Sequence, residues 1–305
     1  MSGRQTWLVR VGVLLLVVFA LMALVGPWFV GDPNATVAPI NTAPSAHDWL
    51  GTTNTGQDVW AQLVVAARGS LLISCVAALL ASLIAVVVGV TGAVIGGLWD
   101  EVLSLFTNAM PVIPTLPLVV VVAGYAKNSG ALVVAVVIAI TGWSWSARIY
   151  RAQTMSLRNR DFVLAARASG ETTLRIVAAE VLPHLLPLIA AQFLGTVLYA
   201  IMTQAGLAFL GIGSVSEWTW GTMLYWANSA QAFQLGQWWW YVPPGLCIAL
   251  FGTALVLLNG AIDKIADDRA TERAPQLRRW SRDRTTAATP AAQPPMAAPP
   301  AEVDA

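Results

Sequence analysis

The stretch VGVLLLVVFALMALVGPWFV, residues 11–30, carries no charged side chain. A helix needs about 20 apolar residues to cross the roughly 30 Å of hydrocarbon in a membrane, and this stretch supplies them. Arg4 and Arg10 precede it, an arrangement that can also begin a secretory signal peptide. No small-x-small cleavage site stands out after the run, so the sequence predicts a transmembrane helix within residues 1–30.

Five further apolar runs of similar length come later in the chain, at roughly 69–96, 102–125, 130–150, 185–210 and 239–262. The whole chain of 305 residues is 57% hydrophobic and only 11% charged, far more apolar than a soluble globular protein. These features predict an all-α, polytopic membrane protein with about six transmembrane helices.

The segments between the runs define the predicted domain organisation. Residues 31–68 are rich in Pro, Gly, Asn and Thr, which is typical of an irregular, water-facing loop, here external. A transmembrane domain is expected over 69–265, with a cytoplasmic loop at 156–184. Residues 270–305 are rich in Arg, Ala and Pro and are predicted to form a disordered cytoplasmic tail.

The distribution of basic residues predicts the orientation of the chain. If the N-terminus is cytoplasmic and there are six spans, all 17 lysines and arginines except Arg68 and Lys127 fall on the cytoplasmic side. Such an excess marks the cytoplasmic face of membrane proteins, so both termini are expected there. The net charge of +1 gives no indication of a nucleic-acid partner.

Glycines and prolines suggest where helices pack closely or break. Small residues spaced for close helix packing occur in the second span, at Gly89, Gly92, Gly96 and Gly97. Three prolines in the third span, Pro111, Pro114 and Pro117, predict a kink or a break. This bend could line a translocation path, or it could be a packing kink away from one.

Tryptophans gather between residues 211 and 240, in a segment without lysine or arginine up to residue 238. Because tryptophan favours the boundary between lipid and water, the tryptophans of this segment are expected to be membrane-interface anchors rather than a ligand-stacking site. They are Trp218, Trp220, Trp226, Trp238, Trp239 and Trp240.

The sequence lacks the motifs of an enzyme or of a self-energised pump. The two lysines, Lys127 and Lys264, do not fit a Walker A motif, and ionisable residues occur only at the edges of the predicted spans. His47 and His184 belong to no HExxH pattern. We therefore expect neither ATP hydrolysis nor other catalysis by this chain, and a proton-coupled carrier is disfavoured. Cys75 and Cys247 lie in apolar spans, where a packing role is expected.

The most informative connection is SLRNRDFVLAARASGETTLRIVAAEVLPHLLP, residues 156–187. Its first part predicts a helix through Ala168, with Phe162, Ala165, Ala166 and Ser169 close to one face. Gly170 would end this helix, and a second helix from about Thr172 through Val181 would stop before Pro183. Such a helix-Gly-helix projection suits docking into a groove on a partner protein. A plain basic loop at the lipid surface is the alternative.

This connection resembles the "EAA" coupling loop of ABC-importer permeases, with its pattern E-A-A-three residues-G and then nine residues to L-P. The positions that match are Ala165, Ala166, Gly170, Ile176, Leu182 and Pro183. Leu164 replaces the family's Glu, and Glu180 stands where the peptide-importer branch often has His. The resemblance implies that these matching residues, together with Phe162, form the ATPase-coupling surface.

Other segments resemble the peptide/nickel branch of these permeases, which includes the dipeptide and oligopeptide importers, and within it the second of the two permease subunits. These are HDWLGTTNTGQDVWAQLVVAARGSL at 47–71, where Gln57 replaces an Arg, GLAFLGIG at 206–213, and Trp220-Gly221. The matches are collinear over most of residues 45–270.

The resemblance implies a non-catalytic permease subunit in a bacterial inner membrane, working by alternating access. Its expected partners are a second permease, two P-loop ATPase subunits that bind ATP and Mg, and an external solute-binding protein. No cofactor is expected in this chain, and no catalytic or metal site. The alternatives are a self-contained ion-coupled carrier and a channel or structural subunit.

Overall fold

The computed structural model describes the backbone of residues 3–114, 117–118, 121 and 130–287. Side chains are described within 7–114, 117–118, 121 and 130–262. The chain divides into two compact units, residues 1–263 and 264–305.

Helices make up the described part of the chain, as predicted. They are α1 (Gly3–Leu24), α2 (Val59–Ile95), α3 (Gly97–Ala109), α5 (Ala131–Arg158), α6 (Asp161–Ala168), α7 (Thr173–Ile176), α8 (Leu182–Phe209), α9 (Trp220–Ser229) and α10 (Trp238–Ala287). Extended segments within this part pair only as two isolated bridges, Thr36 with Gln57 and Thr52 with Asp58.

Five helical segments among the described residues are long and apolar enough to cross a membrane. They are Trp7–Trp28, Val59–Ile95, Ala131–Arg158, Thr173–Phe209 and Trp238–Ile262. The other predicted span, 102–125, is represented by α3 and a 3-10 turn at Met110–Val112 that contains Pro111. The expected break at the prolines is therefore present, and the remainder of that span lies mostly outside the described residues.

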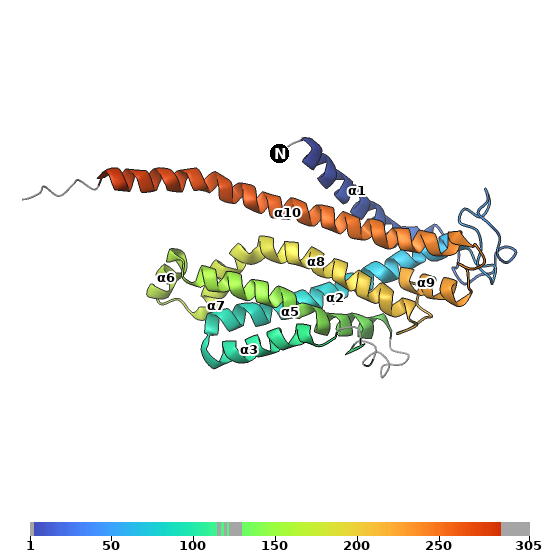
Figure 1. The fold of residues 1–305 in the computed structure, drawn as a ribbon, viewed down its shortest axis with the longest axis horizontal. Coiled ribbons are helices and arrows are strands. Elements are labelled where there is room, and N and C mark those ends of the chain that lie inside the picture. Colours follow the sequence, from blue (N-terminus) through green and yellow to red (C-terminus); the bar gives the residue numbers. More distant parts are fainter. Residues whose placement is uncertain (1–2, 115–116, 119–120, 122–129, 288–305) are drawn as a thin grey trace, which may run out of the picture. The chain divides into compact units, whose positions relative to one another are not determined.

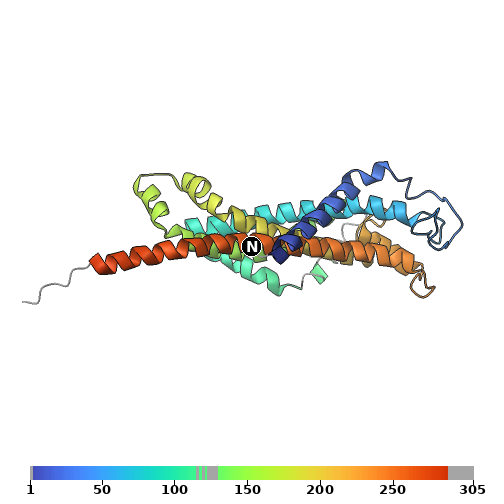
Figure 2. The ribbon, with the colours of Figure 1, turned by 90° about the horizontal axis from the view of Figure 1, so that it is seen from above.

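The helices α2, α5 and α8 pack against one another and form the centre of the first unit (Figures 1 and 2). The short helix α6 lies at one end of this bundle, and α9 lies at the opposite end together with the loop that precedes α2 (Figure 1). The connection at 156–187 and the tryptophan-rich segment thus occupy opposite ends.

The helix α2 begins at Val59, earlier than the expected second span at residue 69. Asp58 accounts for this start, because its carboxylate accepts a hydrogen bond of 2.9 Å from the backbone N–H of Trp60 and caps the helix. Most of the first turns are also buried, including Val59, Ala66 and Ala67. At 37 residues the helix is longer than a single crossing requires.

Two glycines predicted to pack in the second span instead form a turn. Gly96 has φ +73° and Gly97 has φ +60°, left-handed conformations that glycine adopts without strain. They end α2 and start α3. Gly89 does serve close packing, since a Cβ there would lie 2.5 Å from the carbonyl oxygen of Ala147 on α5.

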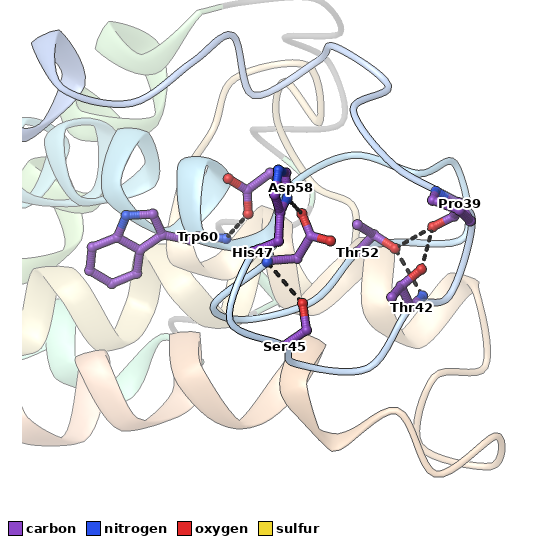
Figure 3. Close-up of polar contacts among 8 residues, drawn as sticks. Pro39, Thr42, Ser45, His47, Thr52, Asp58 and Trp60 are labelled. Carbon is purple, nitrogen blue, oxygen red and sulfur yellow. Dashed lines mark hydrogen bonds and ion pairs between the residues drawn. The ribbon is translucent and has the colours of Figure 1, made fainter.

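The loop before α2 is held by threonine and aspartate hydrogen bonds (Figure 3). The hydroxyls of Thr42 and Thr52 both donate to the carbonyl of Pro39, at 2.8 and 2.7 Å, and the Thr42 N–H donates to the Thr52 hydroxyl at 2.9 Å. Thr52 is fully buried. The polar composition that predicted an irregular loop therefore also gives it a defined conformation.

Trp220 is wrongly predicted as an interfacial anchor, because it is fully buried in the main core. Its ring packs edge-on against Phe19 of α1 at 5.5 Å and Phe251 of α10 at 6.4 Å. Its indole N–H donates to the carbonyl of Leu63 in α2 at 3.2 Å, so the polar atom is satisfied inside the core. Trp240, which is 3% exposed, is also a core residue and not an interfacial anchor. Trp238 is 51% exposed and remains compatible with an interface position.

In the second unit, the backbone is helical from residue 264 to 287, where the sequence predicted disorder from 270. The segment contains six arginines and four alanines, which favour helix, and the helical backbone continues past Pro275. Residues 288–305 lie outside the described residues, and disorder there stays a prediction.

The buried position of Trp220 yields a stability prediction. Trp220→Ala should lower the free energy of unfolding in mild detergent by about 3–5 kcal/mol, because it leaves a cavity among α1, α2 and α10. Trp28→Ala, at a side chain that is 80% exposed, is the matched control and should change it little. Thermal unfolding of both variants gives the comparison, and an equal loss of stability in the two would contradict the core position of Trp220.

Candidate functional site

The helix α6 has charges that suit its dipole, with Asp161 in its first turn and Arg167 in its last. Its face is not the uniform one predicted from sequence. Phe162 and Ala166 are half-buried, whereas Ala165 and Ser169 are exposed.

Val163 is the residue that anchors α6. It is fully buried and lies in a cluster with Val90 and Val94 of α2, Ile176 of α7 and Leu185 of α8. The short helix is thus attached to the bundle by one buried side chain and two half-buried neighbours.

Gly170 ends α6 in a Schellman motif, as the sequence indicated. Its N–H donates to the carbonyl of Arg167 at 3.0 Å, and the N–H of Glu171 donates to the carbonyl of Ala166 at 3.1 Å. The motif needs a left-handed backbone conformation at the first residue after the helix cap, and Gly170 supplies it with φ +78°. No described atom lies within 4 Å of the position of a Cβ on this glycine, so the constraint is conformational rather than steric.

The second helix does not stop before Pro183, and this prediction is wrong. α7 passes through a π-helical segment, Val177–Val181, directly into α8. The N–H of Leu182 bonds to the carbonyl of Val177, five residues back. The wider π turn accommodates the proline without ending the helix, as π-bulges often do at functional sites. Thr173–Phe209 therefore forms one continuous helical segment.

Ile176 is buried, with 3% of its surface exposed, and lies in the same apolar cluster as Val163. Ile176 therefore packs on the bundle side of the turn. Leu182 is half-buried and Pro183 is exposed.

Phe162 and His184 form a second link between α6 and α8. Their rings are stacked, with centroids 4.8 Å apart and an interplanar angle of 19°. The Nδ1 atom of His184 lies 2.6 Å from the carbonyl oxygen of Glu180, which orients the imidazole. His184 is thus held between the ring of Phe162 and the backbone at Glu180.

The exposed surface of the turn is mixed, because two leucines lie among polar and charged residues that include Arg167, Ser169 and Arg175. Leu174 is 84% exposed and Leu164 is 49% exposed, and Ala165 and Gly170 are exposed between them in sequence. Leu164 takes the position of the family's Glu. Exposed leucines beside arginines, on a turn anchored by buried residues, are suited to contact with another protein.

An ion pair that the sequence analysis missed fixes the base of this region. Arg151 on α5 binds Asp100 on α3 in a bidentate manner, with Nε–Oδ1 and Nη2–Oδ2 distances of 2.6 and 2.7 Å. The Arg151 hydrogen bond lowers the pKa of Asp100 below its usual value. The sequence carries no signal for this pair, because Arg151 and Asp100 are 51 residues apart.

Arg158 makes a related contact. Its Nη1 donates to the carbonyl of Ala93 at 2.9 Å, close to the C-terminus of α2, where the helix dipole favours a cation. Arg151 and Arg158 therefore connect α5 to the start of α3 and to the end of α2. The sequence analysis used both arginines only to predict the orientation of the chain.

A cavity of about 380 Å³ lies between α5, α8 and the turn after α3. Its lining consists of Met110, Pro111, Thr141, Gly142, Ser144, Trp145, Ser146, Gln192, Gly195, Thr196 and Tyr199. None of these side chains is ionisable near neutral pH, and several carry hydroxyl or amide groups. Polar residues within spans often mark a solute pathway, so this cavity beside the proline turn is a candidate path.

Among the residues that the structure describes, no group of three or more His, Cys, Asp or Glu could hold a metal ion. Cys75 is exposed on α2 and Cys247 is half-buried in α10, and both thiols are free.

Residues 81–269 match the family described as "Binding-protein-dependent transport system inner membrane component". This range includes the connection between α5 and α8 and the cavity between the two helices.

Individual relatives match over a longer range. The oligopeptide transport system permease protein OppC of Bacillus subtilis is 32% identical over 257 residues, which cover 83% of each chain. The dipeptide transport system permease protein DppC of the same organism is 32% identical, over 90% of this chain and 84% of the relative. The nickel transport system permease protein NikC of Escherichia coli is 32% identical, over 88% and 97%.

The Asp100–Arg151 pair should contribute to stability through a specific interaction. Asp100→Asn is expected to lower the free energy of unfolding by about 1–2 kcal/mol, since a half-buried arginine loses its charged partner. Because the pKa of Asp100 is lowered in the folded state, this contribution is present at neutral pH and is lost as the pH falls through that lowered pKa.

A double-mutant cycle with Arg151→Gln measures the interaction, and Glu101→Gln is the control because Glu101 is an exposed neighbour of Asp100. Additive effects of Asp100→Asn and Arg151→Gln on unfolding in detergent would show that the two residues do not cooperate.

Proposed function

The chain belongs to the family of binding-protein-dependent transport system inner membrane components, and from this premise we propose how its parts operate. It is a permease subunit of an ABC importer. Its described part has the apolar helices of a membrane-spanning subunit.

The turn formed by α6, Gly170 and α7 is the coupling surface that docks onto a P-loop ATPase partner. The observation that carries this proposal is the combination of two exposed leucines, Leu164 and Leu174, with a buried anchor at Val163 and Ile176. A partner can bury the two leucines, while Val163 and Ile176 connect the turn to α2 and α8 so that the turn and these helices would move together. Phe162, Ala165, Ala166, Gly170, Ile176, Leu182 and Pro183 shape this surface, with Ile176 acting from beneath.

Movement of the coupling surface would reach the spans through two rigid connections. α6 follows α5 after a two-residue link, and α7 continues through the π segment into α8. The Phe162–His184 stack joins the two sides. Since α5 and α8 also line the 380 Å³ cavity, a rigid-body displacement of the turn would change the shape of the cavity. Alternating access by such rocking is the proposed mechanism.

The coupling turn faces the cytoplasm in this proposal, and both termini lie on the same side. The excess of basic residues on that side supports this orientation. The loop before α2 and α9 then face outward, at the end where an external solute-binding protein would deliver its cargo.

The solute is proposed to be a peptide or a similar small solute. Relatives named as oligopeptide, dipeptide and nickel permeases support this range. The further proposed partners are a second permease and two ATPase subunits that bind ATP and Mg.

Affinity purification of the chain in mild detergent, followed by mass spectrometry, tests the assembly. Recovery of a P-loop ATPase and a second permease is the expected result. Recovery of this chain alone, from a preparation that remains folded, would favour the alternative of a self-contained carrier or channel.

Substitution of Gly170 tests the coupling surface. Gly170→Arg should abolish co-purification of the ATPase and solute uptake, because the left-handed conformation costs about 1–2 kcal/mol for a non-glycine residue and a bulky cation is added to the turn. Gly170→Asn is the matched variant, since asparagine tolerates this conformation, and it should retain most of the ATPase. Membrane insertion of both variants should be normal. Full ATPase recovery and uptake with Gly170→Arg would refute the assignment.

A further inference from the structure

A second, larger cavity lies at the end of the bundle opposite the coupling turn. Its volume is about 460 Å³, within the range of small-ligand sites. It is formed by the loop before α2, the start of α2, the segment before α9, α9 itself and the start of α10. The coupling mechanism does not use it.

Indole rings form much of its wall. Trp218, Trp226 and Trp240 all line the cavity. The indole N–H of Trp226 donates to the carbonyl of Val215 at 3.2 Å, and that of Trp218 donates to the side-chain oxygen of Asn34 at 3.2 Å. These bonds hold two of the rings in place before any ligand arrives.

A chain of carboxamides continues from Asn34. The Nε2 of Gln57 donates to the backbone carbonyl of Asn34 at 3.2 Å, and the Nε2 of Gln62 donates to Oε1 of Gln57 at 2.8 Å. The network joins the loop, α2 and the segment before α9 into one preformed wall. A preorganised wall loses little conformational entropy when it binds.

Several polar groups of the lining are either unpaired or exposed. The Oε1 of Gln62 and the indole N–H of Trp240 are buried and have no hydrogen-bond partner among the described residues. Asn54 is exposed, and its side chain makes no hydrogen bond to another described residue. Ser216 and Ser229 also line the cavity and are exposed. The carboxamide of Asn54 and the hydroxyls of Ser216 and Ser229 are the groups that a ligand could reach, and they offer both donors and acceptors.

Every described residue that lines this cavity is uncharged. A free dipeptide carries an ammonium and a carboxylate, and transfer of either into a partly dry cavity without an opposite charge is costly. A carboxamide side chain, in contrast, carries a donor and an acceptor that match the C=O and N–H of a secondary amide. Indole faces cover the apolar parts of such a group.

We propose that this cavity binds uncharged backbone amides in the interior of an incoming peptide and rejects its charged ends. The proposal rests on the proposed function in peptide import, and it assigns a neutral subsite to the end of the permease where the solute enters. Peptides of three or more residues supply such an interior amide, with the charged termini left outside the cavity.

The test uses the full chain with its co-isolated subunits in lipid nanodiscs and three probes of similar size. They are N-acetyl-glycylglycine amide, which is neutral, glycylglycine, which is zwitterionic, and glucose, which offers hydroxyls instead of amides. Equilibrium dialysis with labelled probes should show that the blocked dipeptide binds about tenfold more tightly than either of the others.

Three variants locate the binding. Trp226→Ala should weaken binding of the blocked dipeptide by about fivefold or more, whereas Trp238→Ala, at an exposed tryptophan outside the lining, should leave it unchanged. Asn54→Asp adds a carboxylate without breaking a hydrogen bond of the network, and should shift the preference toward glycylglycine because its ammonium gains a partner.

Glycylglycine or glucose binding as tightly as the blocked dipeptide would overturn the proposal, and so would an equal effect of Trp226→Ala and Trp238→Ala. Absence of binding by all three probes would overturn it as well. Failure of the importer function is distinguishable, because it would appear as loss of the ATPase from the purified complex, whereas failure of this subsite leaves the complex intact.

Discussion

The pairing of α2 with α5 is the interaction on which the rest of the structure depends. Gly89 lets the two helices approach closely, since a side chain there would collide with the backbone at Ala147. Arg151 then binds Asp100 just beyond the end of α2, and Arg158 caps the C-terminal carbonyls of α2. Because α5 leads directly into α6, these contacts determine where the coupling turn projects from the bundle.

The coupling turn is small, yet it is attached at both ends to helices that line the central cavity. Its stiffness comes from three different sources: the Schellman bonds around Gly170, the buried Val163 and Ile176, and the Phe162–His184 stack. The π segment contributes differently, because it carries the helical backbone past Pro183 and keeps α7 and α8 continuous. In the proposed mechanism, a turn with these properties would move as one body when a separate ATPase drives it.

The two cavities share a neutral, hydrogen-bonding lining and differ in how they are built. The cavity between α5 and α8 is lined by hydroxyls, amides and a proline turn, and would change shape with the helices. The cavity near α9 is walled by tryptophans and a preformed carboxamide network. Among the described residues, neither lining presents a charged side chain that could hold a solute by ion pairing.

The sequence by itself determined the membrane-spanning character, five of the spans, the break at the prolines and the glycine-terminated turn, because apolar run length and local backbone preference are properties of neighbouring residues. Only the tertiary structure decided that Trp220 is a core residue, that Ile176 lies beneath the turn and that Arg151 binds Asp100. Each of these depends on residues from distant segments, such as Phe19 and Phe251 around Trp220. A tryptophan or an arginine has the same local signature with or without such a partner, so its role becomes visible only when the helices are packed together.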